Sequence, residues 1–125
     1  MEEKLKRFIK NTDVISEKEQ KQLFNKSVLI AGCGGLGGFV GEYLTRLGIG
    51  TLILCDYDSF EHSNTNRQLL CTEDTLKKNK AAEAEKRSYL INPNINVIAI
   101  TEKLTEKNIN DILSQADMVI DALDN

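Results

Sequence analysis

The chain has 125 residues, of which 28% are charged and 41% apolar, and its formal net charge is −3. These values predict one globular domain, and the negative net charge argues against a nucleic-acid partner. No apolar run approaches the roughly 18 residues that a membrane-spanning helix needs, and the N-terminus lacks a signal-peptide pattern, so we expect a cytoplasmic protein without a membrane partner.

Helical patterns precede the first apolar run. Residues 2–10 carry apolar side chains at the spacing of one helix face. Ser16 and Glu19 form the pattern of a capping box, in which a serine oxygen and a glutamate carboxylate each accept a hydrogen bond from a free N–H at a helix start. We interpret residues 1–26 as an N-terminal helical extension and residues 27–125 as the main domain.

Apolar runs alternate with helical patterns in the main domain. This alternation predicts parallel strands joined by right-handed crossovers, and we expect an α/β, Rossmann-like doubly wound sheet in the order 3-2-1-4. Thr105 is the expected N-cap of the last helix. The predicted strands are residues 27–32, 51–55, 95–100 and 117–121. The fourth strand would be an uncovered edge, so we expect a domain that is incomplete at its C-terminus or covered by a partner.

A glycine-rich turn follows the first strand, in the run Gly32-Cys33-Gly34-Gly35-Leu36-Gly37. Glycines let the backbone approach an anion closely, and the first N–H groups of the helix that begins there have no partners. Asp56 ends the second strand about 20 residues after Gly37, as expected for an acid that binds ribose hydroxyls. This fingerprint predicts a nucleotide but leaves dinucleotide and mononucleotide open.

The residues after Asp56 favour ATP over a redox dinucleotide. Asp58 adds a second acid, and the run Ser63-Asn64-Thr65-Asn66-Arg67-Gln68 supplies an arginine within a dozen residues. A redox Rossmann domain has no general need for an arginine at this place. An NAD-dependent oxidoreductase therefore leaves Arg67 unexplained, together with Lys80 and Asp124.

The cysteines and the single histidine give no catalytic pattern. Cys33, Cys55 and Cys71 are odd in number and lack C-x-x-C spacing, which argues against a disulfide framework and against zinc ligands within this chain. We expect small apolar fillers, with a pKa lowered by the helix N-terminus as the alternative for Cys33. A surface role is expected for His62, because no nucleophile can be paired with it.

Together with Lys80, Ile91-Asn92-Pro93 and Asp121-Ala122-Leu123-Asp124-Asn125, these motifs resemble the ThiF/MoeB/HesA family. This family comprises bacterial relatives of ubiquitin-activating enzymes, and the resemblance extends from about residue 7 to the end of the chain. It implies an adenylyltransferase that uses ATP and Mg²⁺. The implied reaction joins AMP to the C-terminal glycine carboxylate of a ubiquitin-like sulfur carrier of the ThiS or MoaD type, in thiamine, molybdopterin or related sulfur-transfer biosynthesis.

The resemblance also assigns residues to roles. The implied catalytic residues are Arg67, Lys80, Asp124 and Lys10, and Asp124 would help to hold Mg²⁺. The implied nucleotide-binding residues are Gly32, Gly34, Gly35, Gly37, Asp56, Asp58, Ser63, Asn64, Arg67, Gln68, Lys80, Asp124 and Asn125. Because a carboxylate nucleophile is already ionised at pH 7, positioning and charge neutralisation suffice, and no acid–base pair is required.

The chain departs from its relatives in two respects. Arg7-Phe8-Ile9-Lys10 stands where relatives commonly carry an Arg-Tyr-x-Arg-like segment that reaches the nucleotide of the other subunit, so we expect a homodimer with Lys10 near the partner's phosphates. Relatives usually continue with a catalytic or persulfide-forming cysteine and zinc-binding cysteine pairs. The alternative function is therefore a truncated or degenerate module that binds nucleotide or carrier without turnover.

Overall fold

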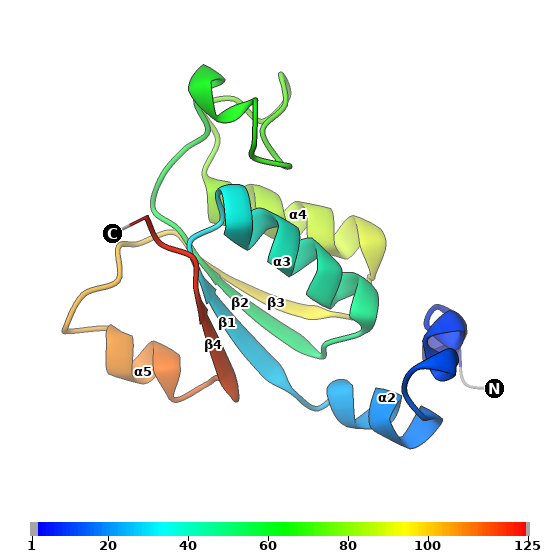
Figure 1. Cartoon of the computed structure of the whole chain (residues 1–125). Coiled ribbons are helices and arrows are strands. Elements are labelled where there is room, and N and C mark those ends of the chain that lie inside the picture. Colours follow the sequence, from blue (N-terminus) through cyan, green and yellow to red (C-terminus); the bar gives the residue numbers. More distant parts are fainter. Residues whose placement is uncertain (1–2, 125) are drawn as a thin grey trace.

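The computed structural model describes residues 3–124, and its centre is a four-stranded parallel sheet (Figure 1). The strands are β1 (Ser27–Ala31), β2 (Thr51–Cys55), β3 (Asn96–Ile100) and β4 (Met118–Asp121). They are arranged in the order β3-β2-β1-β4, which confirms the predicted topology. In the register, Leu29 of β1 lies between Ile53 of β2 and Val119 of β4.

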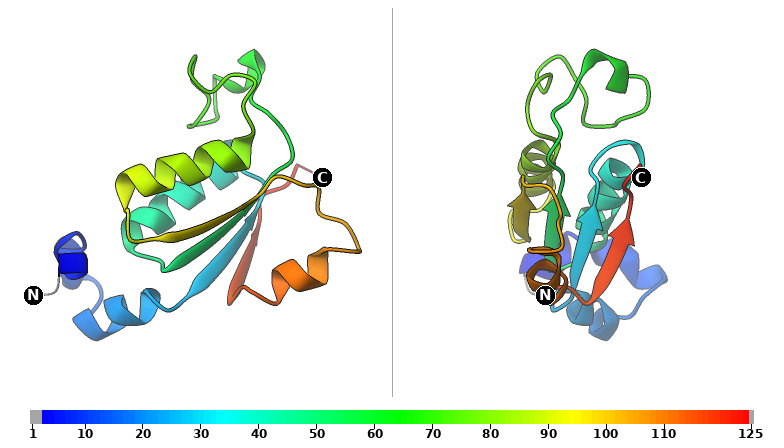
Figure 2. Two further views of the ribbon diagram at one scale, coloured as in Figure 1. Left: turned by 180° about the vertical axis from the view of Figure 1, so that it is seen from behind. Right: turned by 90° about the vertical axis from the view of Figure 1, so that its left-hand side faces the viewer.

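Helices cover both faces of the sheet (Figures 1 and 2). The helices α3 (Gly35–Leu47) and α4 (Lys80–Ile91) pack on one face, and the short helix α5 (Ile109–Leu113) packs on the other. Parallel strands covered on both faces are uninterrupted apolar runs, and β1 and β2 have this character. Leu29, Ile30 and Leu52 have no exposed surface.

Glycines allow α3 to begin directly above the end of β1. A Cβ on Gly37 would lie 1.7 Å from the carbonyl oxygen of Gly32, so only glycine lets the first turn of the helix approach this turn. Gly48 ends the helix with φ +103°, the left-handed conformation that glycine adopts without strain. The glycine turn therefore serves packing as well as any ligand.

The N-terminal part forms three short helices, α1 (Glu3–Lys6), η1 (Ile9–Asp13) and α2 (Glu17–Leu23). The capping box of Ser16 and Glu19 is present as predicted. One continuous helix up to residue 10 is not formed. Asn11 instead donates hydrogen bonds to the Gln20 side chain and to the carbonyl of Leu47, contacts that hold the chain in a tighter 3-10 turn.

The start of α5 differs from the prediction. Asn108, and not Thr105, precedes its first residue. The Asn108 side chain turns back, accepting a hydrogen bond from the Thr105 N–H and donating one to the Lys103 carbonyl. These contacts close a turn before the helix and tie down the loop that follows β3. Among residues 3–124, no helix is long and apolar enough to cross a membrane.

Candidate functional site

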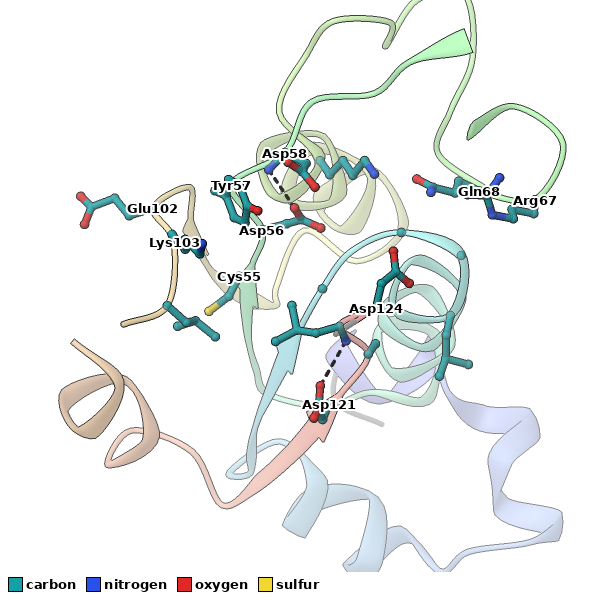
Figure 3. Close-up of a pocket in the computed structure, with 18 residues that line it drawn as sticks. Cys55, Asp56, Tyr57, Asp58, Arg67, Gln68, Glu102, Lys103, Asp121 and Asp124 are labelled. Carbon is teal, nitrogen blue, oxygen red and sulfur yellow. Dashed lines mark hydrogen bonds between the residues drawn. The ribbon is translucent and has the colours of Figure 1, made fainter. Parts of the chain in front are cut away.

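A pocket of about 640 Å³ opens where the carboxyl ends of the strands meet (Figure 3). Open α/β sheets bind ligands at this edge, close to the point where the strand order reverses. The glycine turn, the crossover from β2 to α4, and the loops after β3 and β4 contribute its walls. The predicted site residues that line it are Gly32, Gly34, Gly35, Asp56, Asp58, Arg67, Gln68, Lys80 and Asp124.

Other predicted site residues lie outside the pocket lining. Gly37 is buried against the turn at Gly32, and Ser63 belongs to the short helix η2 (His62–Asn64). The Oδ1 atom of Asn64 accepts a hydrogen bond from the Glu61 N–H at 2.9 Å, so this side chain closes its own turn. Asn125 lies outside the described residues.

The N-terminal helical segment, to which Lys10 belongs, lies at the end of the sheet opposite the carboxyl ends of the strands (Figure 1). Its neighbour Asn11 binds the carbonyl of Leu47 at the C-terminus of α3, whereas the pocket lies at the N-terminus of the same helix. Thirteen helical residues separate these ends by about 20 Å. Lys10 therefore cannot reach the pocket of its own chain.

Asp56 connects the end of β2 to the glycine turn. Its Oδ2 atom accepts a hydrogen bond from the Cys33 N–H at 2.8 Å, and its Oδ1 atom accepts one from the Asp58 N–H at 2.9 Å. An ionised carboxylate has about four acceptor sites, so two remain for hydroxyl donors in the pocket. The sequence indicated the ribose-binding position of this acid but not its contact with the glycine turn.

Lys80 is a largely covered lysine in an unfavourable position for a positive charge. It is the first residue of α4, where the helix dipole disfavours positive charge, and it is only 8% exposed. No carboxylate of the described residues lies within ion-pair distance, and the Nζ atom faces the Phe60 ring with 5.7 Å to its centroid. The Nζ atom itself is not among the buried atoms that lack a partner, because it opens to the pocket, where no described carboxylate pairs with it. An anion bound in the pocket would supply the missing charge.

Arg67 extends from the crossover loop near the glycine turn. Its Nη1 atom donates to the Ser63 carbonyl and to Asn66 Oδ1. A Cβ atom added to Gly35 would lie 3.9 Å from the Arg67 Cγ atom, so the arginine side chain passes close to the glycine turn. The guanidinium is exposed and forms no ion pair within residues 3–124. It therefore retains donors that can bind an anion above the turn.

The sequence did not indicate one wall of the pocket. Tyr57, Glu102, Lys103 and Leu104 line it, and Lys103 Nζ lies 5.5 Å from the centre of the Tyr57 ring. The predicted strand order could have indicated this wall, because the loop after the third strand must begin beside the end of the second strand. Figure 3 shows this wall on the side of Asp56, away from Arg67 and Gln68.

The three cysteines are buried and free. Burial, reinforced by the charge of Asp56, raises the pKa of the Cys55 thiol to about 11 and raises the pKa of Cys33 as well. A lowered pKa for Cys33 is therefore wrong, because desolvation dominates at this position. Within the described part of the chain, no three His, Cys, Asp or Glu side chains are grouped so that they could hold a metal ion.

The chain is similar in sequence to proteins named as adenylyltransferases of sulfur carriers. A sulfur carrier protein ThiS adenylyltransferase of Escherichia coli is 37% identical over 113 residues, which cover 90% of this chain and 45% of that protein. A sulfur carrier protein adenylyltransferase of Thermus thermophilus is 40% identical over 106 residues, covering 85% of this chain and 39% of that protein. This chain thus spans about half, or less, of the length of these relatives.

A solved structure agrees with the sequence comparisons. The E. coli tRNA N6-threonylcarbamoyladenosine dehydratase in complex with ATP superposes with a TM-score of 0.93 and 31% identity, covering 97% of this chain and 50% of that one. The model of the ThiF family matches residues 5–125. The chain therefore belongs to the ThiF family.

Proposed function

We propose that the chain binds ATP and adenylates the C-terminal glycine carboxylate of a ubiquitin-like sulfur carrier. The observation that carries this proposal is Lys80, a largely covered lysine whose ammonium group opens to a pocket that a glycine turn also lines and has no counter-ion within residues 3–124. Relatives named as adenylyltransferases of such carriers support the reaction, and related structures in complex with ATP or AMP support the nucleotide.

The proposed reaction needs positioning and charge neutralisation. A carboxylate oxygen of the carrier attacks the α-phosphorus of ATP, the bond from this phosphorus to the bridging oxygen breaks, and pyrophosphate leaves. Arg67 and Lys80 would hold phosphate oxygens, and Asp56 would accept hydrogen bonds from the ribose. Asp124, with other pocket acids nearby, fits the one or two carboxylates by which Mg²⁺ is held beside phosphates, and the ion would neutralise further charge.

Turnover distinguishes this proposal from a module that only binds. ATP–pyrophosphate exchange that depends on a ThiS- or MoaD-type carrier would establish adenylation. Tight binding of ATP or carrier without exchange would instead favour the binding module.

Replacing Arg67 or Asp56 with alanine is expected to weaken ATP binding roughly tenfold or more in each case, because a hydrogen bond to a charged group contributes about 1.5–3 kcal/mol. Isothermal titration calorimetry with ATP and Mg²⁺ measures this loss. Arg46→Ala is the control, since Arg46 is an exposed arginine near the far end of α3. Unchanged affinity in both pocket variants would contradict the assignment of the site.

We also propose a homodimer in which Lys10 approaches the partner's phosphates. The distance of Lys10 from its own pocket and the exposed side chains Met118 and Val119 on β4 support this arrangement. Light scattering at about tens of micromolar, with ATP present, is expected to give the mass of a dimer. Lys10→Ala should lower turnover more than stability. A monodisperse monomer would contradict the proposal.

A further inference from the structure

The side chain of Gln68 is buried without a hydrogen-bond partner. The residue is only 7% exposed, lines the pocket, and is preceded by Arg67. Its Oε1 atom is the single buried side-chain polar atom within residues 3–124 that lacks a partner, whereas its Nε2 atom is not in that group and stays accessible. Buried carboxamides are normally paired, because an unpaired one keeps the full cost of desolvation. A ligand in the pocket would provide the missing partners.

Backbone hydrogen bonds hold Gln68 in place, and its side chain packs against the glycine turn. The Gln68 N–H donates to the Asn64 carbonyl at 2.9 Å, and the Gln68 carbonyl accepts from the Cys71 N–H at 2.9 Å. On the other side, a Cβ on Gly34 would lie 3.2 Å from Nε2 and 3.3 Å from Cδ, so the side chain packs against the glycine turn. The backbone bonds and this packing together keep the carboxamide beside the turn.

As placed, Oε1 needs a hydrogen-bond donor, which the phosphates do not provide. Phosphate oxygens only accept hydrogen bonds, and a carboxamide oxygen needs a donor. The donors of ATP are its ribose hydroxyls and its base, and the ribose position is at Asp56. Figure 3 shows Gln68 beside Arg67 and across the pocket from Asp56 and Tyr57. This separation favours a donor that belongs to the second substrate.

We propose that Gln68 recognises the amide group next to the reacting carboxylate of the acyl substrate. This inference rests on the proposed adenylation. A C-terminal glycine carries an N–H on the carbon that bears its carboxylate, and a carboxamide matches an amide by accepting from its N–H and donating to its carbonyl. The substrate class is thus a carboxylate of an N-acylated amino acid. The resemblance had implied a nucleotide role for Gln68, and the buried acceptor assigns it to the substrate instead.

The proposal can be tested with two short peptides and one variant. One peptide ends in Gly-Gly, and the other carries an ester oxygen in place of the last amide N–H. Calorimetry on the whole chain, loaded with Mg²⁺ and a non-hydrolysable ATP analogue, is expected to show that wild type binds the amide up to about tenfold more tightly than the ester. In Gln68→Met this preference should fall to about one, whereas the exposed Gln22→Met is the matched control.

Four other results would overturn the proposal, and each would point to a different reason. An undiminished amide preference in Gln68→Met shows that another group reads the amide. A loss of nucleotide affinity without a loss of amide preference assigns Gln68 to ATP. Nucleotide binding without binding of either peptide removes the peptide substrate class but leaves the nucleotide site intact. Failure to bind the nucleotide removes the proposed function itself.

Discussion

Replacing Gly37 with alanine is expected to destabilise the fold by more than about 3 kcal/mol or to prevent folding. The new Cβ would lie 1.7 Å from the carbonyl oxygen of Gly32 and 2.7 Å from its carbonyl carbon. Both atoms are backbone at the end of a buried strand, so neither can move without separating α3 from β1. Urea unfolding followed by circular dichroism measures the free energy of unfolding.

Gly38→Ala is the matched control for this prediction. A Cβ at Gly38 would lie 3.6 Å from the Cys33 carbonyl oxygen, an ordinary van der Waals contact. Alanine in a helix is favoured over glycine by about 0.5–1 kcal/mol, so Gly38→Ala should leave stability unchanged or raise it. Equal stability of the two variants would show that the glycine turn does not pack as described.

Replacing Lys80 with methionine should have opposite effects on ATP binding and on the stability of the free protein. Loss of a buried charge-assisted contact is expected to weaken ATP binding by about ten- to hundredfold. Without ATP, the variant should be slightly more stable than wild type, because methionine fills a similar volume without a positive charge at the N-terminus of α4. Calorimetry and thermal unfolding, with and without ATP, measure the two effects.

Lys78→Met removes the same charge from an exposed position two residues earlier and is the control. It should change ATP affinity little and give no gain in stability. If Lys80→Met destabilised the free protein and left ATP affinity unchanged, Lys80 would be part of the core and not of an anion site.

The parts of the fold that depend on local pattern were predictable. The apolar runs of β1 and β2 determined the sheet, and the glycine turn followed by Asp56 indicated the pocket edge. The wall at Lys103 was not predicted, because the Asn108 side chain fixes that loop through contacts that periodicity does not reveal. Asn64 matched a ligand-binding pattern, but its Oδ1 atom is committed to a backbone N–H of its own turn.

The contact between Asp56 and the Cys33 N–H has a consequence for evolution. A residue that both assembles the pocket and faces its ligand remains under selection for folding even in a lineage that has lost turnover. The guanidinium of Arg67 binds only atoms of its own loop within the described residues, so mutations can accumulate there once catalysis no longer matters. Among descendants of this fold, the arginine and not the aspartate would therefore distinguish working enzymes from inactive copies.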